Sequence, residues 1–400
     1  MREALSSKAI IATAALVVPM VAVFASKGLA PIFALAGLAA IVSLVLSAAK
    51  PAWPPKIYAV LLGAVLVWGF ASSLWARQPM DSLRLAGVLT LFVIGGLALM
   101  TLARSGNNNF RAGLRRAVIL GYVLGLVLLG EELLFDAPLL RLAIPTTEIF
   151  YFNQGLTALA LLVWPAALAL HQDGRNAAAA VLVTAALAVL SMGESGAAFA
   201  GLAGGVATAL LLRFVPRLGI LAVVAAVAGI LTAPLVVRAL PGTETLRAHY
   251  SSALTSLMPR IGIWTYTADR IDERPITGWG LNSSRFFSSD AEKTVRDPNW
   301  DISTEALPLH PHNAMLQWWL ELGAIGALLF AALAGFLIHG IHKDNGNPWG
   351  KAAAYAQVAT FLAMASVSYG IWQAWWLSLL WLSMIFTTAL LARAPEESRS

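Results

Sequence analysis

Two histidines stand directly before a long apolar run, in residues 309–313, which read Leu-His-Pro-His-Asn. The run begins at Ala314 and is long enough to enter a membrane, so His310 and His312 lie at its mouth. A neutral imidazole has a pKa near 6.5 and takes up a proton at near-neutral pH. The pair therefore predicts acid–base chemistry at a membrane surface. The alternative is a pair of hydrogen-bonded interfacial histidines without a chemical role.

Metal binding is the other chemistry that paired histidines perform. His310 and His312 are two positions apart with Pro311 between them, so they do not form the i, i+4 pair of helical metal sites. No C-x-x-C or H-E-x-x-H motif accompanies them. The chain has no Cys, which excludes disulfides, thiolate ligands and a cysteine nucleophile. We expect neither a metal nor a cofactor.

Arginines are the second candidate group, in the polar stretch before the histidines. Arg260 has no acidic residue within several positions, whereas Arg270 and Arg274 stand among acids with which they are expected to pair. A guanidinium offers a planar, permanently charged fork that fits phosphate oxygens. Residues 275–280, Pro-Ile-Thr-Gly-Trp-Gly, predict a sharp turn that returns the chain toward the membrane. Arg260 is therefore the stronger candidate for binding an anion.

Acidic residues beside apolar runs form a third group. Glu194 lies between two such runs, and Glu131 and Glu132 end another. An ionisable group at membrane depth is costly and marks a functional site, but the same group in a water-facing turn is ordinary. Both interpretations stay open for these residues.

The elements that must position these residues follow from composition. Hydrophobic residues make up 58% of the chain and charged residues 12%, with a mean hydropathy of +0.73; soluble domains are roughly 45–50% apolar and about a quarter charged. Apolar blocks of about 20 residues, the length that spans a bilayer, recur along the chain. We predict an all-α polytopic membrane protein with about twelve transmembrane helices, near residues 9–26, 29–48, 57–75, 84–103, 117–135, 155–170, 177–193, 196–212, 219–236, 314–339, 352–369 and 371–392.

The distribution of Lys and Arg predicts the orientation. With the N-terminus in the cytoplasm, fifteen of the 27 basic residues fall in cytoplasmic segments and four in short external loops. The remaining eight lie in a long loop, 237–313, which the positive-inside rule exempts. This loop is therefore periplasmic in a Gram-negative host, and the net charge of +6 reflects topology rather than a nucleic-acid partner. A cleaved signal peptide ending near Ala25 is the alternative for the first span.

The long loop divides the chain into three parts. Nine predicted spans occupy residues 1–236, the loop occupies 237–313, and three spans with a cytoplasmic tail occupy 314–400. The loop is too rich in aromatic and aliphatic residues for a disordered linker, so we expect it to contain short helices packed on the membrane domain. Trp372, Trp375 and Trp376, beyond the loop, are expected to be interfacial anchors.

Four segments, in this order and topology, resemble the O-antigen ligase and polymerase superfamily. They are residues 260–264, with Arg260 and Trp264 four apart; 275–280; 310–313; and 319–326, which read Trp-Leu-Glu-Leu-Gly-Ala-Ile-Gly. Residues 75–79 and 153–155 look like two weaker landmarks, so the resemblance covers about residues 70–340.

The resemblance implies a GT-C-type, metal-independent, inverting glycosyltransferase in the bacterial inner membrane. It would move a glycan from undecaprenyl pyrophosphate at the periplasmic face, with the sugar hydroxyls of lipid A–core as the expected acceptor. It implies that His312 is the base on the acceptor hydroxyl and that Arg260 clamps the donor pyrophosphate. The substrate-binding neighbours that we expect are His310, Asn313 and Trp264. Trp279 and Trp300 are further loop residues that could stack on sugars.

Two departures from the family pattern leave its second donor contact open. The family has a Ser-Arg pair in the turn that here reads Glu-Ser at 194–195, and Asn-Arg-Gly where residues 153–155 read Asn-Gln-Gly. Arg77, Arg238 or Arg247 could replace the missing arginine. Glu194, which would repel a pyrophosphate, is expected to pair with an arginine or to bind acceptor hydroxyls.

The motifs do not separate the activities of this superfamily. Ligation of the glycan to lipid A–core is the first hypothesis, and an O-antigen or exopolysaccharide polymerase that uses the same donor is the second. A multi-span transporter is the hypothesis from a different class. Transporters usually show internal repeats and ionisable residues near mid-membrane, whereas most charged residues here cluster at span ends and in one loop.

Overall fold

The computed structural model describes residues 2–47, 51–241, 258–287, 295–297, 302–304, 307–344 and 346–392. Within these ranges the protein is helical, apart from two three-residue strands, β1 (Val295–Asp297) and β2 (Ile302–Thr304), which pair antiparallel. The loop 237–313 thus contains a short hairpin beside the helices that the sequence predicted for it.

The N-terminal part of the chain is a series of helices that match the predicted spans closely. They are α1 (Arg2–Ala25), α2 (Leu29–Leu46), α3 (Lys56–Ser72), α4 (Pro79–Arg104), α5 (Asn108–Leu134), the short α6 (Pro138–Ala143), α7 (Asn153–Gln172), α8 (Asn176–Ser191), α9 (Gly196–Phe214), α10 (Gly219–Leu231) and α11 (Ala233–Arg238). Short 3₁₀ turns at Ser26–Gly28, Ile149–Phe152 and Pro216–Leu218 connect some of them.

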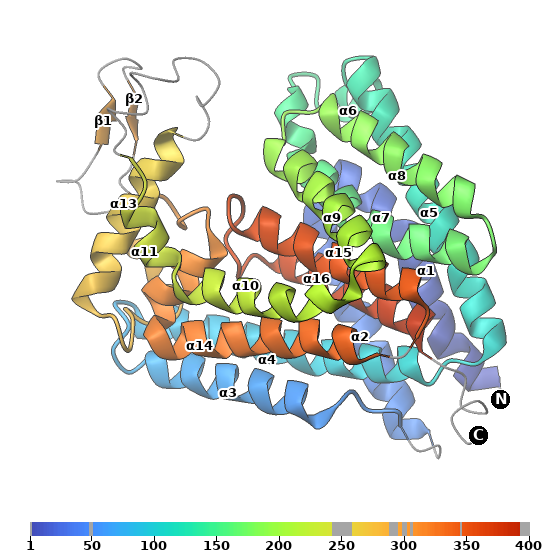
Figure 1. The fold of residues 1–400 in the computed structure, drawn as a ribbon, viewed down its shortest axis with the longest axis horizontal. Helices are drawn as coiled ribbons and strands as arrows, with labels where there is room; N and C mark the ends of the chain where they lie inside the picture. The colour runs from blue at the N-terminus through green and yellow to red at the C-terminus, as the bar shows by residue number, and fades with distance from the viewer. Residues whose placement is uncertain are drawn as a thin grey trace.

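The rest of the chain adds α13 (Met258–Glu273), the 3₁₀ turn η4 (Ser283–Phe286), α14 (Ala314–Lys343), α15 (Pro348–Ala365) and α16 (Ala374–Leu391). In Figure 1, α13, α11 and the hairpin stand at one side, and α5, α6, α8 and α9 at the other. Helix α14 packs on α10, α3, α13 and α15, so it connects the loop elements to the helical body.

Seven helical segments in the described part of the chain are long and apolar enough to cross a membrane. They are Lys8–Leu46, Pro79–Arg104, Asn108–Leu134, Ile149–Gln172, Gly196–Phe214, Ala314–Lys343 and Ala374–Leu391. The first segment, Lys8–Leu46, includes most of α1 and all of α2, which correspond to two predicted spans. Three further apolar helices are shorter: Lys56–Ser72, Asn176–Met192 and Pro216–Leu231. The protein is therefore a multi-pass membrane protein.

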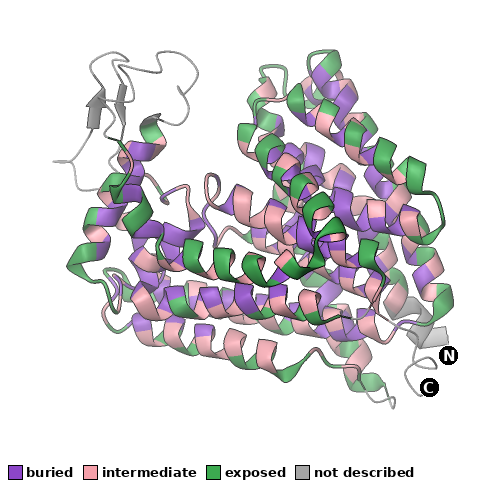
Figure 2. Ribbon diagram, in the orientation of Figure 1, coloured by how far each residue is buried: buried purple, intermediate pink, exposed green. Residues whose placement is uncertain are grey.

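The outer faces of the helices are apolar, as lipid contact requires. Figure 2 shows exposed residues on the outward sides and buried ones where helices meet. Large exposed hydrophobic residues occur on α2, α3 and α4 among other helices, including Leu35, Val45, Val60, Val67 and Leu91. Patches of this extent would be a liability in water. The core centres on α7, which packs against α1, α5, α8, α9, α15 and α16.

Helix α14 is interrupted at Gly323, whose φ of 65° and ψ of −164° are not helical. The interruption removes helical partners from the carbonyls of residues 320–322. The N–H groups of residues 279 and 280 donate to the carbonyls of residues 320 and 321, at 2.9 and 2.8 Å. The indole of Trp68 donates to the Leu322 carbonyl at 2.9 Å. Residues 275–280 therefore bond into the break of a helix that would otherwise leave buried carbonyls unpaired.

The same segment also satisfies the far side of the break. The Ala324 N–H donates to the Pro275 carbonyl at 2.8 Å. This close backbone approach explains the glycines of the segment. A Cβ on Gly278 would lie 2.5 Å from the Glu321 backbone, and one on Gly323 would lie 2.2 Å from the Ile276 carbonyl oxygen. Both glycines also have positive φ, which side chains disfavour.

We expect Gly278→Ala to destabilise the protein, because the new methyl meets backbone atoms that cannot move aside. A clash combined with a positive φ predicts a loss of several kcal/mol, or a melting temperature lower by roughly 5 °C or more. Thermal unfolding in detergent, followed by size-exclusion chromatography, measures this. Gly87→Ala on α4, where an added Cβ meets nothing within 4 Å, is the matched control. Equal melting temperatures for the two variants would contradict the role of Gly278.

Candidate active site

The two histidines lie together at the start of α14. Their ring centroids are 4.3 Å apart and the rings are tilted by 57°. His312 has a φ of 54°, a left-handed conformation that is uncommon for a residue with a side chain. Such backbone persists when its surroundings fix it, and it often marks a functional turn.

Three separate elements hold this turn. From α13, the buried indole of Trp264 donates to the Pro311 carbonyl at 3.0 Å. From η4, the Ser284 hydroxyl donates to the Leu309 carbonyl at 3.3 Å. From the turn between α15 and α16, the Gln373 amide nitrogen lies 3.2 Å from His310 Nε2. Segments that are distant in sequence therefore converge on residues 307–313.

The environment distinguishes the two histidines. Burial, with His312 and Arg285 nearby, lowers the pKa of His310 to about 3. Its Nδ1 accepts the N–H of residue 312 at 3.2 Å, so both ring nitrogens have a neighbour in the protein. Burial thus favours the neutral ring of His310, which contacts the backbone of its own turn.

His312 has the features of a base. Burial and, secondarily, the charge of Arg260 lower the pKa of His312, while a hydrogen bond to the backbone of Ser368 raises it. In a neutral imidazole one ring nitrogen carries a hydrogen and the other can accept a proton, so His312 can act as a base.

Arg260 is the cation beside this base. It lies half-buried on α13, and burial lowers its pKa while Tyr369, on the α15–α16 turn, raises it. Within the part of the chain that the structure describes, no carboxylate forms an ion pair with Arg260. A partly desolvated cation without a countercharge is costly, so this position favours an anionic ligand.

Glu321 fixes the walls of the site. Its side chain, on α14, is fully buried (0% exposed). Its carboxylate accepts hydrogen bonds from the Ser284 hydroxyl at 2.6 Å, the Trp372 indole at 2.8 Å and the Gln317 amide at 3.0 Å, and from the backbone N–H of residue 282. These donors come from η4, the α15–α16 turn and α14 itself. One carboxylate therefore joins α14 to η4 and the α15–α16 turn, two of the elements that hold the histidine turn.

Sequence reasoning overlooked Glu321 as a site residue, although a signal was present. An ionisable residue inside an apolar run is a functional candidate, and Glu321 lies deeper in its run than Glu194 or Glu132 does in theirs. Glu132 accepts the N–H groups of residues 139 and 140, at 2.9 and 3.2 Å, and so caps α6. Its role is structural.

Two of the arginines suggested as a second donor contact have partners within the protein. Arg77 stacks on Phe287 at 4.7 Å and on Trp279 at 5.6 Å, and donates to the Phe286 carbonyl at 3.2 Å. Arg238 forms an ion pair with Asp272 and donates to the carbonyl of residue 268 at 3.0 Å. Arg247, the third, lies outside the described residues.

Glu194 is exposed in the turn between α8 and α9 and forms no ion pair with a described residue. The expected pairing with an arginine is therefore absent there. The turn lies near the start of α7, because a Cβ on Gly193 would touch Leu156 at 2.4 Å. The next residue of α7, Thr157, lies 3.4 Å from the hydroxyl of Tyr369, which faces Arg260. Glu194 is thus on the same side of the protein as the site.

Several residues that the sequence singled out have contacts within the protein. The Asn313 side chain accepts the N–H of residue 316 at 3.1 Å and caps α14. Trp279 donates to the Arg270 carbonyl at 2.8 Å. Trp375 and Trp376 are buried beside Tyr369, with ring centroids 4.7 and 6.0 Å from it, so the expectation that they are interfacial anchors was wrong. Trp300 lies outside the described residues.

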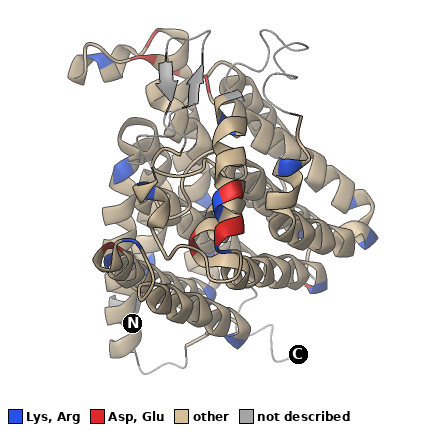
Figure 3. Ribbon diagram, turned by 90° about the vertical axis from the view of Figure 1, so that its left-hand side faces the viewer, with Lys and Arg blue, Asp and Glu red and all other residues tan. Residues whose placement is uncertain are grey.

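Charged residues are few along the helices of the body, as Figure 3 shows in a view onto the left-hand side of Figure 1. Among the described residues, no group of three or more His, Asp or Glu side chains could hold a metal ion. The site therefore offers a neutral imidazole beside a guanidinium that pairs with no carboxylate among the described residues. This arrangement can take a proton from a hydroxyl while it stabilises negative charge on a leaving group.

Comparison with known proteins gives a consistent result. A family model described as O-Antigen ligase matches residues 179–331, which include Arg260, His312 and Glu321. A candidate polysaccharide ligase of Rickettsia conorii is 30% identical over 312 residues, 78% of this chain and 74% of the relative. That of Rickettsia felis is 28% identical over 78% of this chain and 75% of the relative. That of Rickettsia prowazekii is also 28% identical, over 80% of this chain and 77% of the relative. No solved structure matches.

We expect Glu321→Ala to unfold the site, because it removes the shared acceptor of four buried or partly buried donors. Each such loss costs about 1–3 kcal/mol, so the melting temperature should fall by several degrees. Glu321→Gln keeps one acceptor oxygen and should be milder. Glu148→Ala, which removes an exposed carboxylate, is the control. A Glu321→Ala protein as stable as the control would show that the network does not hold the site together.

Proposed function

The chain belongs to the O-antigen ligase family, and on that premise we propose that it transfers a glycan from undecaprenyl pyrophosphate to a sugar hydroxyl of lipid A–core. The reaction would take place at the periplasmic face of a bacterial inner membrane. The observation that carries this proposal is the half-buried Arg260, without a carboxylate partner among the described residues, beside the half-buried imidazole of His312.

The proposed topology has twelve spans, with the N-terminus in the cytoplasm. Each predicted span overlaps a helix, including α3, α8, α10 and α15, which are too short or too polar to count among the seven. Residues 237–313 then form the periplasmic part between the membrane parts 1–236 and 314–400. Lys and Arg counts support this orientation. A GT-C architecture is part of the proposal and rests on the family resemblance.

The proposed reaction needs one base and one cation. His312 takes the proton of the acceptor hydroxyl, and the hydroxyl oxygen forms a bond to the anomeric carbon of the donor glycan. The bond from that carbon to the pyrophosphate oxygen breaks, and its electron pair leaves with undecaprenyl pyrophosphate. Because attack and departure take place on opposite faces, the anomeric configuration inverts. Arg260 stabilises the charge that develops on the departing oxygen.

The energetic demand on this site is modest. A pyrophosphate is a good leaving group, so general base catalysis, worth roughly 10²–10⁴-fold, and a preorganised cation supply the main contributions. Neither contribution requires a metal ion.

We expect His312→Ala to lower kcat by about 100-fold or more, since it removes the base. His310→Ala should lower kcat by less than about tenfold, because His310 only supports the turn. The assay uses the purified protein with an undecaprenyl-pyrophosphate-linked glycan and lipid A–core.

Two results of this assay would overturn the proposal. A His312→Ala protein that keeps most of its activity would exclude His312 as the base. Transfer of the glycan to a second lipid-linked donor, but not to lipid A–core, would make the protein a polymerase.

Arg260 should affect both donor binding and the pH profile. Burial and Arg260 hold the pKa of His312 below 6.5, so the base is unprotonated at neutral pH and the rate falls only in more acidic buffer. Arg260→Gln removes the second cause, so the pKa should rise and the acidic limb of kcat/KM should move to higher pH. The donor KM should also rise, by roughly tenfold or more. Arg260→Lys, which keeps the charge but not the fork, should retain the pH profile and lose donor affinity.

An unchanged acidic limb in Arg260→Gln would show that Arg260 does not act on the base. An unchanged donor KM would exclude the clamp role. Arg84→Gln, which alters an exposed arginine paired with Asp81 on α4, is the matched control for both measurements.

A further inference from the structure

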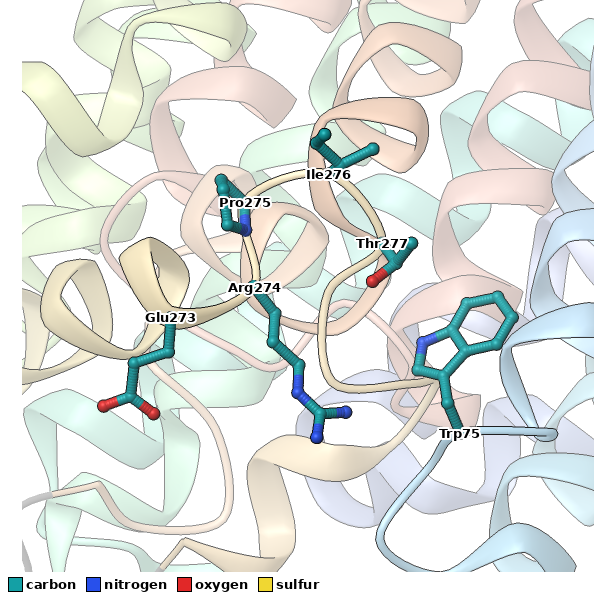
Figure 4. A pocket seen from close by; sticks show the side chains of 6 residues that line it. All are labelled: Trp75, Glu273, Arg274, Pro275, Ile276 and Thr277. Atoms are coloured by element: carbon teal, nitrogen blue, oxygen red, sulfur yellow. The ribbon is translucent and has the colours of Figure 1, made fainter.

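A cavity lies apart from the residues of the candidate active site. It has a volume of about 500 Å³ and is lined by Trp75, Glu273, Arg274, Pro275, Ile276 and Thr277. Figure 4 shows Trp75, which follows α3, facing the end of α13 and the segment that bonds into the α14 break. No step of the proposed reaction uses these side chains.

The polar groups of this cavity are mainly hydrogen-bond donors. Arg274 lies 4.2 Å from the centre of the Trp279 ring and pairs with no carboxylate among the described residues, contrary to the sequence expectation. The Trp75 indole nitrogen is buried and has no acceptor among the described residues. Glu273, a carboxylate in the lining, pairs with Arg270 at 2.7 Å and points away from Trp75 in Figure 4. Donors without acceptors predict an anionic ligand.

The surface beside the cavity is apolar. Ile276 in its lining is 64% exposed, and Leu74, adjacent to Trp75, is 85% exposed. Leu74 follows α3 and Ile276 follows α13, and both lie at the outer face of the membrane in the proposed topology. An anion that binds here would have acyl chains next to it, so the ligand that fits is an amphiphile with a phosphate near its apolar part. A second cation, Arg77, lies against the same Trp279 ring at 5.6 Å.

The cavity is joined to the reaction centre through the backbone. Pro275 accepts the N–H of Ala324, three residues after Glu321, and Glu321 bonds to the Ser284 that contacts the histidine turn. We infer that this cavity binds a phosphate group of the lipid acceptor and so holds its sugar hydroxyls toward His312. The inference rests on the proposed function, and it assigns Arg274 and Trp75 as binding residues for the acceptor.

The test compares diphosphorylated lipid A–core with the same lipid after enzymatic removal of its phosphates. For the wild type, the acceptor KM should be about tenfold lower with the phosphates present, the size expected for a charge-assisted hydrogen bond near the membrane surface. Arg274→Gln should abolish this preference, so that its acceptor KM is the same with and without the phosphates. Trp75→Phe, which keeps the ring but removes the indole N–H, should reduce the preference in part. Arg84→Gln is the control that removes an equal charge elsewhere.

Each other outcome decides against the inference. A wild type without preference, or an Arg274→Gln protein that keeps it, would leave no role for the cavity in acceptor binding. A higher KM for the donor in Arg274→Gln, with the acceptor preference intact, would assign the cavity to the donor pyrophosphate.

Direct binding separates this inference from the proposed function. Native mass spectrometry of the detergent-solubilised protein should show about tenfold less retained diphosphorylated lipid A–core in Arg274→Gln than in Arg84→Gln. If no variant transfers glycan but this difference appears, the proposed function fails and the lipid site stands. Displacement of the retained lipid by millimolar inorganic phosphate would show that the cavity binds a free anion and would overturn the lipid assignment.

Discussion

The interruption of α14 at Gly323 is the constraint on which the rest of the site depends. A helix that breaks inside a membrane protein exposes carbonyl and N–H groups that lipid cannot satisfy, each at a cost of several kcal/mol. Here residues 275–280 enter the break and bond to both of its sides. This requires glycine at 278 and 323, because backbone lies where a Cβ would be. The helix, the inserted segment and the loop that follows are therefore one unit.

Glu321 extends this unit to the catalytic turn. Its backbone carbonyl accepts from the inserted segment, and its side chain accepts from η4 and from Trp372 on the α15–α16 turn. A buried carboxylate is tolerable only when its lone pairs are satisfied, and four donors supply that here. The left-handed conformation of His312 is then fixed by elements that Glu321 holds in place. The conformation of His312 thus depends on the contacts made at the break in α14.

The sequence predicts much of this protein, but not its internal contacts. Apolar blocks predicted helices that the structure contains, and the motifs around Arg260 and His312 predicted residues that the structure brings together. The contacts of single polar side chains could not be predicted, because they depend on partners distant in sequence. Arg274 stacks on Trp279 rather than pairing with an acid, and Asn313 caps a helix. The function of the glycines at 278 and 323 is visible only when the two segments lie side by side.

Both proposed substrates are anionic lipids, and a transferase that uses two such substrates must keep their phosphates apart. Two anions at one cation would compete for it, and their mutual repulsion would grow as water is excluded. In this structure Arg260 lies with His312, whereas Arg274 lies against Trp279 in a separate cavity. The inserted segment carries Arg274 at its start and leads, through Ser284, to the histidine turn. In the proposed reaction, the backbone that completes α14 gives each phosphate its own cation and directs both lipids toward His312.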